Sequence, residues 1–66
     1  MKIIFNGEEL ELQKSLSLLD FIKAQGLPID GTACAVNENI IPKSKWQDFI
    51  LQENMQLDVF TLVAGG

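Results

Sequence analysis

Several side chains that enzymes commonly use are missing from this sequence. It contains no histidine and no tyrosine, and Cys34 is its one cysteine. It has no phosphate-binding loop of the GxxxxGK type followed by Ser or Thr, which excludes ATP binding by that route. The acidic residues are scattered, without the spacing of a metal cage or an acid/base pair. We therefore predict a carrier or binding protein rather than an enzyme, with no catalytic residue, no metal and no bound cofactor.

Positive charge is also scarce. Five Lys and Arg residues face nine Asp and Glu residues, which gives a net charge of -4, and the basic residues form no run. Binding to a phosphate backbone depends on clustered positive charge, so nucleic acid is not an expected partner. An acidic chain is instead drawn to basic surfaces of other proteins.

Long hydrophobic runs are absent, and none approaches the roughly 18 residues that would span a bilayer. The apolar stretch after Lys2 ends at Asn6, which is too short for a secretory signal. A single cysteine cannot form the intramolecular disulfides that small secreted domains usually need. These features predict a cytoplasmic protein without a membrane partner.

The sequence does hold enough apolar residues for one small core. Hydrophobic residues make up 47% of its 66 residues, so we predict a single domain over residues 1–66. A domain of this size buries only about 60% of the surface that its unfolded chain exposes. Such a core leaves little room for a deep substrate pocket.

The first half of the chain predicts a hairpin and a helix. Lys2–Phe5 and residues 9–12 flank Asn6-Gly7, a pair typical of a tight hairpin turn. Alternation places one apolar set on the core face of this hairpin, namely Met1, Ile3, Phe5, Leu10 and Leu12. A short helix then begins after Ser17, a suitable N-cap, and ends at Gly26.

The second half predicts strands around a short helical turn. We expect a buried strand at residues 33–36, an edge strand at 40–41, a helical turn at 43–49 and a last strand at 55–63. A sheet with one apolar face needs a helix to cover it, and the first and last strands are best paired as central neighbours. The predicted fold is α+β: a β-grasp (ubiquitin-like) roll with a mixed sheet of four to five strands and one main helix on one face.

Cys34 is the one conventional nucleophile in the sequence. Its neighbours Ala33, Ala35 and Val36 are apolar, whereas a reactive thiolate needs exposure and nearby cations. We therefore predict a structural role for Cys34 in the core.

The C-terminus is the more distinctive chemical feature. The last strand runs into residues 63–66, Val63-Ala64-Gly65-Gly66, which we expect to form a flexible tail. Without Cβ atoms, an extended diglycine fits a narrow channel in another protein. The terminal carboxylate is ionised at neutral pH, because α-carboxyl pKa values lie at about 3.3 to 3.7, and it can attack the α-phosphate of an ATP held by that protein.

One face of the last strand predicts a docking surface. Phe60 and Leu62 alternate with Leu57 and Val59 and therefore share a face with Asp58. If exposed, Phe60 and Leu62 form an apolar patch that leads to the tail, and such patches are candidate interfaces.

The chain resembles the ubiquitin-like sulfur carrier proteins, most closely those of thiamine biosynthesis. The resemblance runs over the whole length and rests on the order and spacing of short motifs: Asn6-Gly7-Glu8, Ser17-Leu18-Leu19, Ala35-Val36-Asn37, Ile41-Pro42-Lys43, Trp46 and the terminal Val63-Ala64-Gly65-Gly66. One departure is Glu53-Asn54, where the family commonly has a Gly-Asp turn before the last strand.

This resemblance implies a carrier that is acted on by partner enzymes. An E1-like adenylyltransferase would use ATP to adenylate Gly66, and a sulfur-donating enzyme would supply the sulfur of a thiocarboxylate. Thiazole synthase would then receive that sulfur. Gly65, Ala64 and Val63 would thread the partner's channel, while Phe60 and Leu62 would dock both partners.

Three alternative functions stay open at this point. The small subunit of molybdopterin synthase has a similar fold and tail but is usually longer. A ubiquitin-like modifier would use the same adenylate to form an isopeptide bond. A plain β-grasp interaction module would not need the tail, so it would tolerate loss of Gly65 and Gly66.

Overall fold

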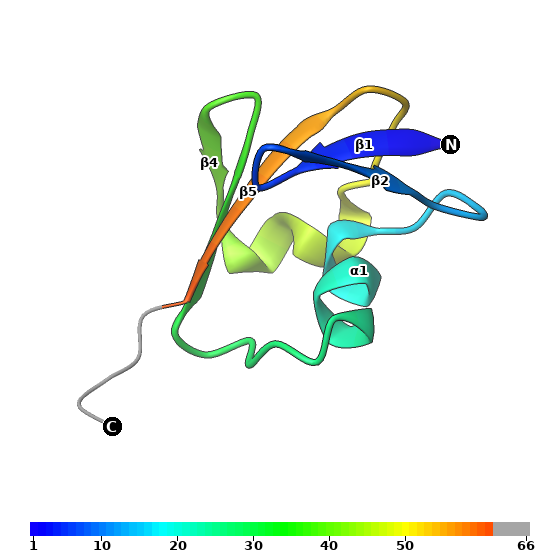
Figure 1. Ribbon diagram of the computed structural model, residues 1–66. Helices are drawn as coiled ribbons and strands as arrows, with labels where there is room; N and C mark the ends of the chain where they lie inside the picture. The colour runs from blue at the N-terminus through cyan, green and yellow to red at the C-terminus, as the bar shows by residue number, and fades with distance from the viewer. Residues whose placement is uncertain (62–66) are drawn as a thin grey trace.

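The computed structural model describes residues 1–61 of the chain, and residues 62–66 lie outside the described part. A five-stranded sheet and two helical segments make up the fold (Figure 1). In chain order the elements are β1 (Lys2–Phe5), β2 (Glu8–Glu11), the α-helix α1 (Leu18–Ala24), β3 (Thr32–Val36), β4 (Asn39–Ile41), the 3₁₀ helix η1 (Lys43–Asp48) and β5 (Gln56–Thr61).

The sheet has the strand order β2-β1-β5-β3-β4. β1 and β5 are parallel, and the other neighbours are antiparallel. The first and last strands of the chain are therefore central neighbours, and α1 and η1 lie on the same side of the sheet (Figure 1). This confirms the predicted mixed sheet of the β-grasp type with one main helix on one face.

The hairpin of β1 and β2 follows from its turn residues. Asn6 and Gly7 have φ angles of 50° and 84°, the left-handed values that a type I′ turn requires at both central positions. The turn sets the register so that Phe5 lies opposite Glu8 and Ile3 opposite Leu10. Ile3 is fully buried, as the alternation predicts.

The helix α1 begins and ends at the residues that its sequence specifies. The Ser17 side chain accepts a hydrogen bond from the backbone N–H of Asp20 at 3.1 Å. At the other end, Gly26 has a φ of 73°, and its N–H donates to the Lys23 carbonyl while the N–H of Leu27 donates to that of Ile22. These two bonds form a Schellman motif, which terminates the helix.

The core lies between the helices and the sheet. Trp46 of η1 is buried, and its indole N–H donates to the Ile41 carbonyl at 2.9 Å. This bond satisfies the polar end of a ring that otherwise packs against apolar side chains. The core cluster consists of Ile3, Leu18, Phe21, Ile22, Cys34, Val36, Trp46, Leu51, Leu57 and Val59.

Candidate functional site

The described part of the chain offers little of the chemistry that enzymes use. Residues 1–61 contain no group of three or more Cys, Asp or Glu residues placed to hold a metal ion. Cys34 is fully buried, and burial raises the pKa of its thiol to about 11. The thiol therefore stays protonated and inaccessible at neutral pH, in agreement with the structural role predicted for it.

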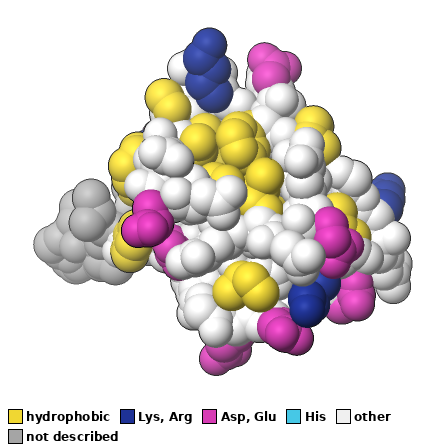
Figure 2. All heavy atoms as spheres, turned by 90° about the horizontal axis from the view of Figure 1, so that it is seen from above, with side chains coloured by type: hydrophobic (Ala, Val, Ile, Leu, Met, Phe, Trp, Pro, Cys, Tyr) yellow, Lys and Arg dark blue, Asp and Glu magenta, His cyan; other side chains and the backbone are white. Residues whose placement is uncertain are grey.

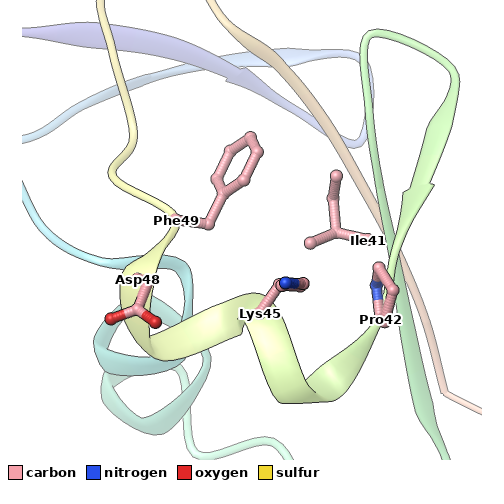
Figure 3. Close-up of a pocket in the computed structure, with 5 residues that line it drawn as sticks. All are labelled: Ile41, Pro42, Lys45, Asp48 and Phe49. Atoms are coloured by element: carbon pink, nitrogen blue, oxygen red, sulfur yellow. The ribbon is translucent and has the colours of Figure 1, made fainter.

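A hollow beside η1 is also unsuited to enclosing a substrate. It lies beside η1 and the end of β4, as Figure 3 shows, and has a volume of about 240 Å³. Pockets that enclose small-molecule ligands have volumes of roughly 300–1,000 Å³. Its lining combines an apolar floor with two opposite charges: Ile41, Pro42, Lys45, Asp48 and Phe49. Phe60, the one predicted site residue among residues 1–61, does not line it.

Strand β5 carries the part of the predicted site that the structure describes. Leu57 and Val59 point into the core and are buried, whereas Phe60 points to the opposite face and is 54% exposed. Phe60 lies opposite Ala33 of β3. The other predicted site residues, Leu62, Val63, Ala64, Gly65 and Gly66, lie outside the described residues.

The face of the sheet opposite the helices continues the apolar surface beyond Phe60. Asp58, Ala35 and Ile40 lie side by side on β5, β3 and β4, and Ile40 is 66% exposed. Figure 2 views the molecule from this side and shows apolar side chains in the middle of the surface with charged side chains around them. We call Phe60, Ala33 and Ile40 the open-face patch; Ala35 lies on the same face but is buried.

Ile40 is a member of this patch that the sequence interpretation missed. The apolar pair Ile40-Ile41 indicates a strand but does not tell which of the two faces the core. In the structure Ile41 packs against the core and Ile40 faces outward. The sequence held no signal for this choice, because it depends on the register that places Ile40 opposite Ala35 of β3.

Two asparagine side chains hold β5 in place where its neighbouring strands end. The Val59 N–H donates to Asn6 Oδ1 at 2.8 Å, and the Gln56 N–H donates to Asn37 Oδ1 at 3.1 Å. Each amide oxygen thus takes the place of a backbone carbonyl next to a turn. The Asn37 bond therefore holds the start of β5, and the Asn6 bond holds the strand two residues before its end at Thr61.

No helix among residues 1–61 is long and apolar enough to cross a membrane. This agrees with the lack of a long hydrophobic run in the sequence.

Comparison with known proteins connects this arrangement to a family. The crystal structure of the thiamine biosynthesis protein ThiS from Geobacter metallireducens has a similar fold, with a TM-score of 0.85, 13% sequence identity and full coverage of both chains. The solution structure of a thiamine biosynthesis protein from the same organism has a TM-score of 0.82 at 13% identity, and the match covers all of this chain and 88% of that one.

Sequence comparison gives the same answer. The sulfur carrier protein ThiS of Escherichia coli (strain K12) is 27% identical over 66 residues, which is the full length of both chains. The family model of the ThiS family matches residues 3–66. Because that match covers nearly the whole chain, this protein belongs to the ThiS family, the family of the sulfur carrier protein of thiamine biosynthesis.

Proposed function

We propose that this chain carries sulfur on the carboxylate of Gly66 and donates it for thiazole formation in thiamine biosynthesis. The observation that carries the proposal is the extent of the family match, which continues through residue 66 and so includes the terminal Gly65-Gly66. The carrier role also fits residues 1–61, whose one thiol is buried and which hold no cluster of metal-binding side chains.

The proposed chemistry uses the tail as substrate of other proteins. A carboxylate oxygen of Gly66 attacks the α-phosphate of ATP, so that an acyl adenylate forms and pyrophosphate leaves. A sulfur nucleophile, written as hydrosulfide in its simplest form, then attacks the acyl carbon and displaces AMP. This leaves a terminal thiocarboxylate, with one oxygen replaced by sulfur. ATP is bound by the partner adenylyltransferase, and the carrier holds no cofactor.

The shape of the tail residues supports delivery to a partner's active site. Ala64, Gly65 and Gly66 are small, and together with Val63 they form the segment that would thread a channel. Three residues before this segment in the sequence, Phe60 exposes about half of its surface on a strand that is bonded to the side chains of Asn6 and Asn37. In this proposal Phe60 and Leu62 dock the E1-like adenylyltransferase and thiazole synthase, whose basic surfaces would attract a chain of net charge -4.

Intact-protein mass spectrometry tests the proposal directly. The chain is incubated with its cognate adenylyltransferase, ATP and a sulfur-donating enzyme, and the expected product has one oxygen replaced by sulfur. A chain without Gly66 is the matched control, because it keeps residues 1–61 but ends in the carboxylate of Gly65, one residue short of the reacting position. It should stay unmodified.

Two other results would contradict sulfur carriage. An unmodified wild-type mass, in the presence of an adenylyltransferase shown to be active, would favour a plain interaction module. A covalent adduct with another protein would favour a ubiquitin-like modifier.

A further inference from the structure

Strand β5 extends past the end of β1. The two strands are parallel, and their pairing ends with Phe5 beside Leu57. The chain then turns at Asn6 and Gly7 and returns as β2 on the far side of β1. The last residues of β5 therefore have β3 on one side and no strand of residues 1–61 on the other.

The hydrogen bonds show which backbone groups of β5 face this gap. Ile4 and Asn6 donate to the carbonyls of Met55 and Leu57, so alternate residues of the strand point toward β1. Along β5, the next residues whose backbone N–H and C=O groups point to this side are Val59 and Thr61. The N–H of Val59 is bonded to Asn6 Oδ1.

Two backbone groups of this edge lack a bond within the described chain. Among residues 1–61, the turn, loop and side-chain hydrogen bonds do not include the Val59 carbonyl or the Thr61 N–H, and the alternation of the strand directs both groups away from β3. One is an acceptor and the other a donor, both on the same side of one strand. This is the pattern that an added strand pairs with.

We propose that this short edge of β5, from Val59 to Thr61, accepts an extended segment of the protein that takes up the tail. The inference rests on the proposed function, because it assigns the docking mode of a carrier whose tail enters a partner. Pairing that begins at Thr61 would align the tail with the partner's strand before the tail reaches the active site. Main-chain hydrogen bonds supply affinity in this mode of recognition, and side chains supply specificity.

The two outer edges of the sheet are less suited to such pairing. β2 carries Glu9 and Glu11, both exposed, and β4 is only three residues long and is followed by Pro42. Charged side chains, short length and proline are features that protect sheet edges from added strands. The gap beside Val59 and Thr61 is the interior edge without such protection.

The side chains next to the gap define the kind of segment that fits. Asp58 and Phe60 lie on the open face of β5, one acidic and partly exposed, the other apolar and 54% exposed. An added strand presenting apolar and basic side chains on this face would complement both. The segment that pairs here is thus a strand of the partner that presents apolar and basic side chains on the open face.

A proline substitution removes the donor of this edge. Thr61→Pro deletes the N–H that faces the gap and leaves the neighbouring bonds to β3 in place, because proline is tolerated on strand edges. Glu9→Pro is the matched control. Glu9 lies opposite Ile4, whose N–H donates to the Met55 carbonyl just before β5, so the Glu9 N–H faces away from the sheet. Circular dichroism and thermal unfolding should show that both variants keep the fold.

The binding assay uses the cognate adenylyltransferase. We expect Thr61→Pro to bind about tenfold more weakly than wild type, the effect of one lost hydrogen bond that leaves its partner group unpaired, and Glu9→Pro to bind as wild type does. Equal affinities of Thr61→Pro and wild type would overturn the proposal. So would an equal loss in both proline variants.

Hydrogen exchange of the wild-type chain gives an independent readout. The Thr61 amide should exchange at least about tenfold more slowly in the complex than in the free protein, and unchanged exchange in the complex would overturn strand addition. The two proposals fail separately in these experiments. A wild-type chain that protects Thr61 but gains no sulfur refutes sulfur carriage, whereas a Thr61→Pro variant that binds and gains sulfur as wild type does refutes the strand edge.

Discussion

Replacing Phe60 by Asp separates an interface role from a core role for this side chain. Phe60 is 54% exposed in the free protein, so only about half of its apolar surface contributes to folding. Full burial of such a side chain is worth about 1.5–3 kcal/mol, and Asp is disfavoured in strands by up to about 1 kcal/mol. We therefore expect Phe60→Asp to lower the free energy of unfolding by about 1–2 kcal/mol.

The expected effect on binding is larger. In the complex, the exposed half of the ring is covered, and Asp would place a charge among apolar groups at that position. Anchor residues of interfaces lose 2 kcal/mol or more on truncation, which corresponds to about a thirtyfold increase in Kd. Isothermal titration calorimetry with the adenylyltransferase measures the Kd, and urea denaturation measures the stability.

Ile50→Asp is the matched control. Ile50 is 49% exposed, close to the exposure of Phe60, but its backbone forms a bridge with Ser17 at the start of α1 rather than with the strands of the sheet. The control should lose a similar amount of stability and keep the wild-type Kd. An unfolded Phe60→Asp variant would show that Phe60 is part of the core. Equal Kd increases in the two variants would show that the open-face patch is not a specific docking surface.

Two further predictions concern stability. Asn6→Gly keeps the left-handed turn and loses only the side-chain bond to the Val59 N–H, so it should lower the free energy of unfolding by about 1–2 kcal/mol. Asn6→Ala should lower it by about 1 kcal/mol more, because residue 6 has a φ of 50°, which alanine adopts at a cost. Equal losses of the two variants in urea denaturation would refute a separate contribution from the backbone. The buried Cys34 predicts a loss of stability at alkaline pH: its thiol pKa is raised from 9.0 to about 11, so the unfolded chain releases a proton between these values that the folded chain retains. Stability should fall by about 1.4 kcal/mol per pH unit in this window, and the difference between wild type and Cys34→Ala should shrink as the pH rises from 9 to 11. A constant difference would contradict this explanation.

The sequence by itself predicted the features that depend on neighbouring residues. Asn6-Gly7 specified the hairpin, and the structure shows the two positive φ angles that this turn requires. Ser17 and Gly26 specified the two ends of α1. The Ser17 side chain accepts the predicted N-cap bond, and Gly26 ends the helix as predicted. Alternation along β5 identified Leu57 and Val59 as core and placed Phe60 on the other face. Turn preferences and the periodicity of apolar residues depend on only a few neighbouring residues, so they can be inferred from the amino-acid sequence alone.

The role of residues 63–66 was also inferred from the sequence, but from their chemistry rather than from a local pattern. Gly65 and Gly66 suggested the carrier chemistry through their small size and their terminal carboxylate, and the family match includes both. They lie outside the described residues, so their role is a proposal that rests on sequence and chemistry.

Tertiary structure decided the features that depend on distant pairs. The outward position of Ile40 is set by its register opposite Ala35, and the bond from Val59 to Asn6 joins residues 53 positions apart. The unpaired edge at Val59 and Thr61 exists because β1 ends while its parallel neighbour continues. Local preferences fix turns, caps and the faces of strands with a clear alternation, such as β1 and β5. Which strands become neighbours, and how far their pairing extends, depends on how the whole chain buries its one core.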